Sequence, residues 1–373
     1  MIVVKEAVTA QELEKFVKFP FKLYKGSKYW VPPIIDEEVN SFNKNINPAF
    51  LSAEAYFYIA YKNDKPVGRI AAIINWNEVK QQKKSKVRFG WWDVVDDIEV
   101  TKALLEKVYE LGKKHGLEYV EGPMGFSNLD KVGVLTEGFD HIGTMVTWYN
   151  YPYYREHLEK LGFVKEKEYL ENKFPVSNVK PDFFQKAEKL IRERYKLKPV
   201  NFKSTNEILP YVDKMFELFN ASYASLSSFV AITEAQKKYF KDKYISFINP
   251  EYIKYVEDAQ GNLVAFSIVM PSFSKALQRT GGKLFPFGLL HLLYAKYFSK
   301  DVVSYLIGIH PEYQNKGVTA IIFNEYYKTF SKRGIKNFIR TPELEENTAI
   351  HQLWKHFGQI THARRRTYRK NLD

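Results

Sequence analysis

The sequence of 373 residues contains no cysteine, which excludes several kinds of site at once. Without a thiol the chain has no disulfide, no thiolate zinc ligand and no cysteine nucleophile. It also lacks a basic N-terminal segment followed by a long apolar one, so a secretory signal is not expected. Its longest apolar stretch, residues 284–298, contains proline, histidine and lysine and is too short to span a bilayer. We therefore expect a cytoplasmic protein without stable membrane insertion and without a metal site.

Aromatic residues and positive charge are abundant instead. Aromatic residues make up 16% of the chain and hydrophobic residues 45%, enough for cores built largely from rings. The formal charge of +13 favours an anionic partner, either a phosphate-bearing cofactor, a nucleic acid or a membrane surface. Two dense basic clusters, at residues 80–88 and 364–370, are expected to lie on solvated loop or strand faces.

The same order of elements is expected twice along the chain. The first pass has a strand at 2–8, helical segments up to 30, a hairpin at 55–75, a strand at 87–95, a helix at 100–116, a strand at 119–123, a helix at 153–163 and a strand at 164–176. The second pass has a strand at 198–203, helices at 207–223 and 233–247, a hairpin at 251–270, a strand at 302–310, a helix at 316–334, a strand at 336–342, a helix at 348–358 and a strand at 361–370.

Two matching passes predict two similar domains of mixed α/β (α+β) class. We place the first at residues 1–178 and the second at 197–373. A connecting helix at 179–196 has Phe184, Ala187, Leu190 and Ile191 at helical spacing. An insert at 272–300 interrupts the second pass and has several possible roles: a lid, an acyl-chain pocket, a membrane-binding element, or plain packing against the domain.

The stretch "HPEYQNKGVTAIIF", residues 310–323, passes from a strand into a helix through one polar turn. Pro311 has no N–H to continue a strand ladder, so the strand should end there. A turn that feeds a helix leaves backbone N–H groups unpaired, and the helix dipole adds positive charge, so a phosphate fits this position. Gly317 would permit a positive φ and a close approach to that ligand. A tight turn with nothing bound is the alternative.

The motif "HPEYQNKGVT" resembles the acetyl-CoA loop of the GNAT superfamily of N-acetyltransferases. In that loop a Gln or Arg is followed after two residues by Gly, and after one more residue by Gly or Ala. Gln314 and Gly317 match, whereas Thr319 stands where a smaller residue is usual. "EENTAIHQLWKHFG" resembles a second family motif, in which an Asn opens a helix that closes on a Gly, here Asn347 and Gly358. Asn347 is equally suited to be a plain helix cap.

This resemblance implies two tandem GNAT-like domains, each with a mixed, splayed central sheet flanked by helices. It implies that acetyl-CoA or another acyl-CoA binds the second domain, with pantetheine against the backbone of Ile307 and Ile309 and with Asn347 nearby. The pyrophosphate would lie on the turn made by Gln314, Asn315, Lys316, Gly317, Val318 and Thr319. Family members transfer the acyl group directly from CoA to an amine.

The corresponding turn of the first half carries four carboxylates, at Asp93, Asp96, Asp97 and Glu99, and has no glycine after Gly90. These negatively charged carboxylates would repel a pyrophosphate, which is also negative. They are favourable at the start of a helix, where the helix dipole is positive. We therefore expect the first domain to be a degenerate copy without a CoA site.

Transfer to an amine requires a base, for which His310, Glu343 and Glu345 are the candidates. The tyrosine that acts as acid in many family members is replaced by Trp354, whose indole cannot serve. The function predicted is acyl-CoA-dependent N-acyltransfer, most simply acetyl transfer, to a small-molecule or peptide amine. The alternatives are an aminoacyl-tRNA-dependent ligase of tandem-GNAT type and a non-catalytic module that binds CoA or nucleic acid. The oligomeric state is not indicated.

Overall fold

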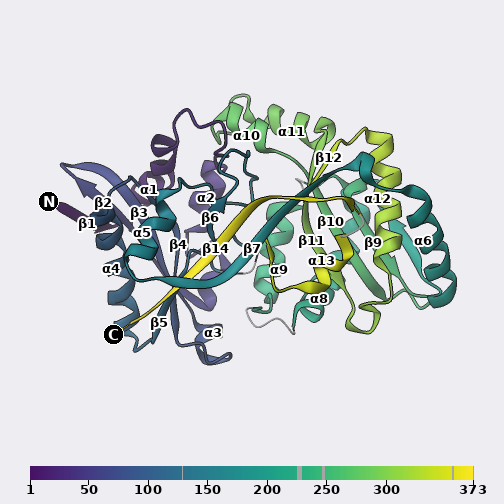
Figure 1. The fold of residues 1–373 in the computed structure, drawn as a ribbon, viewed down its shortest axis with the longest axis horizontal. Helices are drawn as coiled ribbons and strands as arrows, with labels where there is room; N and C mark the ends of the chain where they lie inside the picture. Colours follow the sequence, from purple (N-terminus) through teal and green to yellow (C-terminus); the bar gives the residue numbers. More distant parts are fainter. Residues whose placement is uncertain (128, 225–228, 246–247, 355–356, 373) are drawn as a thin grey trace. The chain divides into compact units, whose positions relative to one another are not determined.

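The computed structural model describes residues 1–127, 129–224, 229–245, 248–354 and 357–372, and the chain forms two compact units (Figure 1). The N-terminal unit comprises Met1–Leu170, Ser274–His291 and His362–Asp373. The C-terminal unit comprises Glu171–Phe273 and Leu292–Thr361. Each unit is a mixed sheet with helices on its faces, so the predicted fold class is confirmed.

The N-terminal unit follows the predicted order of elements with a few additions. Its elements are β1 (Ile2–Glu6), α1 (Ala10–Leu23), α2 (Ile35–Ser41), β2 (Ala53–Lys62), β3 (Lys65–Asn75), α3 (Trp76–Lys80), β4 (Lys86–Val94), α4 (Ile98–Lys114), β5 (Tyr119–Gly122), β6 (Val134–Glu137), α5 (Tyr153–Lys160), the first part of β7 (Val164–Pro175), α10 (Ser274–Thr280) and most of β14 (Ile360–Asn371).

The hairpin of β2 and β3 shows how local sequence sets this sheet. Asn63 and Asp64 both have positive φ, 51° and 58°, the two-residue turn that joins twisted antiparallel strands. Alternate residues of β3 then face opposite cores, Ile70 and Ala72 on one side and Ala71 on the other. Helix α4 covers the first face and α1 the second. The strand order is β1-β2-β3-β4-β5-β14.

The basic cluster at residues 80–88 is not wholly solvated, contrary to the prediction. Lys86 and Arg88 lie on β4 and are buried, where they form ion pairs with the buried carboxylates of Glu78 and Glu121. Burial alone would raise the pKa of Glu78, but Arg88 and Lys86 outweigh it and hold this pKa at about 2. A local charge pattern cannot reveal this network, because Glu121 joins it from a strand more than thirty residues away.

The C-terminal unit repeats the pattern. Its elements are α6 (Pro181–Tyr195), β8 (Lys198–Asn201), α7 (Thr205–Ile208), α8 (Val212–Tyr223), α9 (Glu234–Tyr244), β9 (Ile253–Glu257), β10 (Leu263–Pro271), most of α11 (Gly288–Phe298), β11 (Asp301–Ile309), α12 (Thr319–Arg333), β12 (Asn337–Arg340), β13 (Glu343–Leu344) and α13 (Thr348–Trp354). The strand order is β7-β12-β11-β10-β9-β8, with β13 paired to β7. Part of the helix predicted at 233–247 and part of that at 348–358 lie outside the described residues.

Helix α12 packs with α6 in the core of this unit, where the two lie side by side (Figure 1). The first half of α12 is buried on all sides, from Thr319 to Tyr326, and Phe330 is buried after it. On α6, Phe184 is buried and Ile191 packs on the same core. The spacing predicts Leu190 on that face as well, but its side chain is 62% exposed. Ile191 follows Phe184 by about two helical turns, so the two side chains lie on the same face of α6. Leu190 lies about 100° around the helix axis from Ile191 and therefore points away from that face.

The two units do not follow the contiguous ranges expected from the sequence, because each is completed by a strand from the other half of the chain. Residues Tyr368 to Asn371 of β14 pair with β5 of the N-terminal unit. Lys173 to Pro175 of β7 pair with β12 of the C-terminal unit. The order of strands along the chain does not specify which sheet edge a strand joins. Residues 274–291 of the insert also belong to the N-terminal unit, where the Ser274 hydroxyl donates to Gly143 O at 2.8 Å.

Candidate functional site

Two neighbouring strands of the C-terminal unit part from each other. β11 and β12 pair in parallel only from Asp301↔Asn337 to Ser304↔Arg340. Beyond Ser304, β11 continues to Ile309 and is paired with β10 on its other edge. The register between β10 and β11 shifts where this parting begins: Ile268 pairs with Leu306 and Val269 with Ser304, so Tyr305 is the extra residue of a bulge in β11. One edge of β11 is therefore unpaired by any described strand over its last residues.

The backbone of Ile307 and Ile309 faces this open edge. The His310 amide donates to Val264 O of β10 at 2.8 Å. Because N–H and C=O groups point alternately to the two sides of a strand, Gly308 also faces β10. Ile307 and Ile309 consequently face away from β10, toward the side where β12 has ended. This is the side on which the sequence resemblance places pantetheine.

The turn after β11 holds several unengaged donors. Asn315 and Gly317 have positive φ, 61° and 75°, and Gln314 to Gly317 are exposed. The amides of Asn315, Gly317, Val318 and Thr319 donate no hydrogen bond to any described group. Alternation of left- and right-handed residues turns successive amides into one concave, anion-binding arrangement. The first turn of α12 adds the positive end of its dipole there.

Residues of α6 pack against this turn. The Tyr313 ring packs edge-on against Tyr195 with centroids 6.3 Å apart, and Lys316 Nζ lies 5.5 Å from the centroid of the Tyr195 ring. A Cβ on Gly317 would lie 3.3 Å from Ile191 Cδ1, a tight contact. The positive φ therefore restricts this position to glycine more strongly than its space does.

Comparison with known proteins finds no matching family model. Protein YghO of Escherichia coli (strain K12) is 25% identical over 375 residues, covering 99% of this chain and 95% of its own. A bacterial ceramide synthase of Caulobacter vibrioides (strain NA1000 / CB15N) is 23% identical over 289 residues, covering 77% of this chain and 74% of its own. Among solved structures, a tandem GNAT protein from the clavulanic acid biosynthesis pathway superposes with a TM-score of 0.59 and 10% identity, covering 100% of this chain and 99% of its own. The chain has a tandem GNAT fold.

The predicted fold is thereby confirmed, and the parting of β11 and β12 is the splay expected of a GNAT sheet. Among the described residues no helix is long and apolar enough to cross a membrane.

Two hydroxyl groups that sequence reasoning missed approach the open edge of β11. Tyr223 Oη donates to Ile307 O at 2.7 Å, and Ser222 Oγ donates to Ile309 O at 3.0 Å. Both residues are in the last turn of α8. Burial raises the pKa of Tyr223 to about 12, so its hydroxyl keeps its proton at neutral pH. No sequence signal marks them, because only tertiary packing brings the end of α8 to β11.

The three candidate bases lie in different surroundings. His310 follows β11 as expected, but its Nδ1 accepts the Glu312 amide at 3.4 Å and caps the following 3₁₀ turn. Glu343 forms an ion pair with Arg340, a buried side chain whose pKa is lowered to about 9 by burial. Glu345 is exposed in the loop between β13 and α13. His310 and Glu343 therefore have different partners and do not bond to each other.

The residues of the second motif occupy structural positions. Asn347 Oδ1 accepts the Ile350 amide at 3.3 Å, so the side chain caps α13. Trp354 is buried beneath Arg340, with the guanidinium carbon 4.6 Å from the ring centroid. Gly358 has φ of 56°, as a glycine that closes a helix would. The cap role of Asn347, which the sequence allowed, is observed.

The equivalent place in the N-terminal unit is closed. Past the paired residues of β4 and β5, the Met124 amide donates to Phe89 O at 2.8 Å. A Cβ on Gly90 would lie only 2.3 Å from Met124 O, so the backbones are in contact. At the start of α4, the Asp97 carboxylate accepts the Glu99 amide at 3.1 Å. The two strands of this unit thus stay together where β11 and β12 part.

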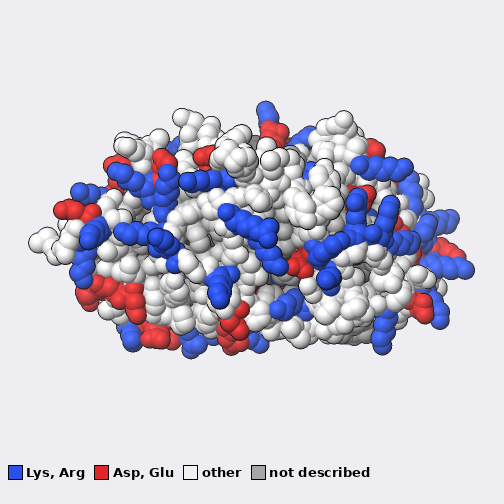
Figure 2. All heavy atoms as spheres, turned by 90° about the horizontal axis from the view of Figure 1, so that it is seen from above, with Lys and Arg blue, Asp and Glu red and all other residues white. Residues whose placement is uncertain are grey.

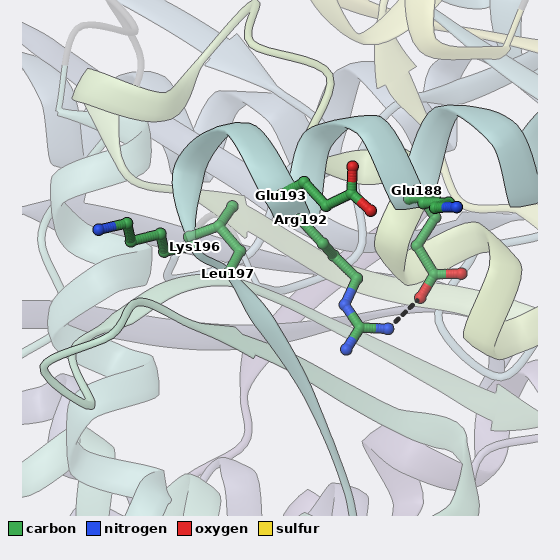
Figure 3. A pocket seen from close by; sticks show the side chains of 6 residues that line it. Glu188, Arg192, Glu193, Lys196 and Leu197 are labelled. Carbon is green, nitrogen blue, oxygen red and sulfur yellow. Dashed lines mark hydrogen bonds and ion pairs between the residues drawn. The ribbon is translucent and has the colours of Figure 1, made fainter.

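A cavity of about 350 Å³ lies beside the C-terminal half of α6 (Figure 3). It is lined by Glu188, Lys189, Arg192, Glu193, Lys196 and Leu197. Two carboxylates lie among its cations, and Arg192 pairs with Glu188 at 3.2 Å. None of the predicted site residues lines this cavity, so it is separate from the turn that begins α12.

Proposed function

We propose that the chain is an acyl-CoA-dependent N-acyltransferase whose C-terminal unit binds the thioester and transfers its acyl group directly to an amine. The observation that carries the proposal is the set of unengaged amides at Asn315, Gly317, Val318 and Thr319, next to the open edge of β11. The tandem GNAT fold supports it, because this edge and this turn are where the resemblance places CoA.

The residues present fit such a ligand. The turn from Gln314 to Thr319 would hold the pyrophosphate, with the Lys316 ammonium and the Thr319 hydroxyl as further donors. The amides of Ile307 and Ile309 would bind pantetheine or the oxyanion of the transfer. When bound, the CoA thioester supplies an activated acyl group.

The transfer needs an acid for the leaving thiolate and a base for the attacking amine. The Tyr223 hydroxyl, protonated at neutral pH, is the proposed donor near the end of pantetheine. The proton of the amine would go to His310, Glu343 or Glu345. Asn347 would contact the cofactor through groups that its cap bond leaves available.

The acceptor class is proposed from the relatives. A ceramide is the amide of a long-chain base, so the bacterial ceramide synthase is a relative whose named product contains an N-acyl bond. This supports amide formation, and it adds a lipid amine to the small-molecule and peptide amines predicted from the sequence. The relative similarly supports long acyl chains beside acetyl as donors.

The test is thermal stabilisation by CoA, acetyl-CoA and palmitoyl-CoA. A ligand at about 100 times its Kd should stabilise the wild type by about 2.7 kcal/mol. Gly317→Glu should abolish this shift, because it places a carboxylate and a Cβ at the anion-binding turn. Gly261→Glu is the matched control, since Gly261 has φ of 82° in the β9–β10 turn and a Cβ there would meet nothing within 4 Å.

Release of free CoA thiol in the presence of acetyl- or palmitoyl-CoA and a panel of amines, including a sphingoid base, then tests transfer. Stabilisation without turnover on any amine would favour a non-catalytic CoA-binding module. No stabilisation by any thioester would end the CoA proposal.

A further inference from the structure

The exposed apolar side chains of this chain are concentrated in one segment. Of the eighteen large hydrophobic residues that are exposed in the described chain, eight lie between residues 285 and 298. They are Phe285, Phe287, Leu289, Leu290, Leu293, Tyr294, Tyr297 and Phe298. An aromatic side chain buries about 150–250 Å² when it is fully covered, so each half-exposed ring leaves on the order of 100 Å² of apolar surface in contact with water. Five such rings amount to about 500 Å², the size of the largest apolar patch on a typical monomer, and such a patch often has a function.

Helix α11 is apolar on two faces, but only one is covered. Leu292 and Ala295 are buried, at 3% and 8% exposure. Leu290, Tyr294 and Phe298 follow one another at intervals of four residues on a different side, and they are 62%, 64% and 60% exposed. Side chains four apart form one stripe along a helix. We call this stripe, together with the exposed Phe285 and Phe287 that precede it in the chain, the apolar ridge.

The charged side chains of the insert itself all have one sign. The insert, residues 272–300, contains Lys275, Arg279, Lys283, Lys296 and Lys300 and no aspartate or glutamate. Lys275, Arg279 and Lys283 are exposed. Figure 2 views the molecule from the side of α10 and α11, and this face carries many Lys and Arg side chains together with some acidic ones.

We propose that the apolar ridge docks on an anionic lipid surface, with α11 lying in the plane of the membrane interface. An apolar helix face flanked by cations and aromatic rings is the chemistry that such a surface recognises. At 11 residues, α11 is about 16 Å long, too short to cross a hydrocarbon core of about 30 Å. The acyl tails would cover Leu290 and Phe298, while the tyrosine hydroxyls would stay at the level of the headgroups.

Charge argues against a second copy of the chain as the occupant. In a two-fold symmetric contact the same patch meets itself, so the cations Lys275, Arg279 and Lys283 would approach other cations of the same set. The insert offers no carboxylate to compensate them. A lipid surface supplies both the apolar layer and the negative charge. This docking goes beyond the proposed acyl transfer and does not depend on CoA binding.

The test is flotation of the full-length protein with vesicles of phosphatidylcholine alone or with phosphatidylcholine and phosphatidylglycerol in a ratio of about two to one, which gives the negative surface that basic segments recognise. The wild type should float with the anionic vesicles at low salt. The variant Phe285→Ser/Leu290→Ser/Tyr294→Ser should bind at least tenfold more weakly. Its matched control is Leu51→Ser/Val164→Ser/Phe183→Ser, which removes side chains 79%, 63% and 51% exposed elsewhere and should float normally. Circular dichroism checks that each variant is folded.

A second variant, Lys275→Gln/Arg279→Gln/Lys283→Gln, tests the contribution of charge and should lose most binding to anionic vesicles. Its control is Lys102→Gln/Lys113→Gln/Lys114→Gln, which removes three exposed lysines elsewhere and should bind like the wild type. The proposal is overturned if the wild type does not float, if the apolar-ridge variant floats like the wild type, or if binding ignores the charge of the vesicle. It is also overturned if light scattering finds a dimer that the apolar-ridge variant abolishes.

Discussion

At the residue scale, the proposed cofactor site consists of backbone amides more than of charged side chains. The sequence indicated that Gly317 could adopt a positive φ, and its φ of 75° agrees with this. It did not predict the positive φ of Asn315, which a side chain that tolerates this region allows. It also missed Ser222 and Tyr223, since their approach to β11 depends on how α8 packs.

Tyr223→Phe tests the role of the buried hydroxyl. Loss of its hydrogen bond to Ile307 O should cost about 1 kcal/mol, roughly 2–4 °C in Tm for a unit of this size. If the hydroxyl donates during transfer, kcat should fall about tenfold or more while KM changes little. Tyr61→Phe, on β2 of the N-terminal unit, is the control. Unchanged Tm and kcat in Tyr223→Phe would remove this residue from the mechanism.

Lys254 supplies a pH-dependent prediction. Its ammonium is buried against Asn201 and Thr329, at 2.7 Å and 2.9 Å, and burial lowers its pKa to about 8. Between pH 8 and about 10.5 the unfolded chain therefore binds the proton that the folded chain has released, so folding is favoured as pH rises. The stability of the wild type relative to Lys254→Met should increase over this window, measured by urea denaturation at each pH. A constant difference would show that the folded pKa is not depressed.

At the element scale, the decisive contrast lies between two pairs of parallel strands. β11 and β12 part after Ser304, whereas the segment after β5 stays bonded to β4 through Met124. From the acidic residues at the first turn, the sequence predicted that the first domain lacks a CoA site and that these acids begin a helix; Asp97 does cap α4 there. The contact between Gly90 and Met124 adds a steric reason that no charge pattern could supply.

Gly90→Ala should therefore destabilise the N-terminal unit without changing the CoA site. A Cβ placed 2.3 Å from Met124 O must displace the backbone, which typically costs about 1–3 kcal/mol or more. The thermal shift produced by CoA should stay within error of the wild type, because the turn at Gly317 is untouched. Equal stability of Gly90→Ala and wild type would mean that this junction has room for a methyl group.

At the scale of the whole molecule, the sequence predicted the order of helices and strands but not which strands pair with each other. The hairpins, central strands and helices lie close to the predicted residues, since turn residues and hydrophobic periodicity are local signals. Element order places the strand at 361–370 in the second domain, yet it pairs with β5 and β6 of the N-terminal unit. Strand pairing depends on contacts between residues far apart in the sequence, and a local sequence pattern does not report such contacts.

This strand exchange predicts that the two halves do not fold independently. A fragment of residues 1–178 lacks β14 and would leave the edge of β5 unpaired. A fragment of residues 197–373 lacks β7, the partner of β12, and α6, which covers α12. Each should be insoluble or molten alone, while co-expression should recover a complex. Cooperative unfolding of either fragment by itself would contradict the exchange.

The most direct measurement of the central claim is an amide NMR titration of the deuterated protein with CoA. The amide resonances of Asn315, Gly317, Val318 and Thr319 should shift together and saturably, because these donors have no described acceptor in the free protein. The amides at the start of α4, where Asp97 already accepts a bond, should not move. Shifts that leave the turn at Gly317 unchanged, or that appear at α4 instead, would contradict the claim.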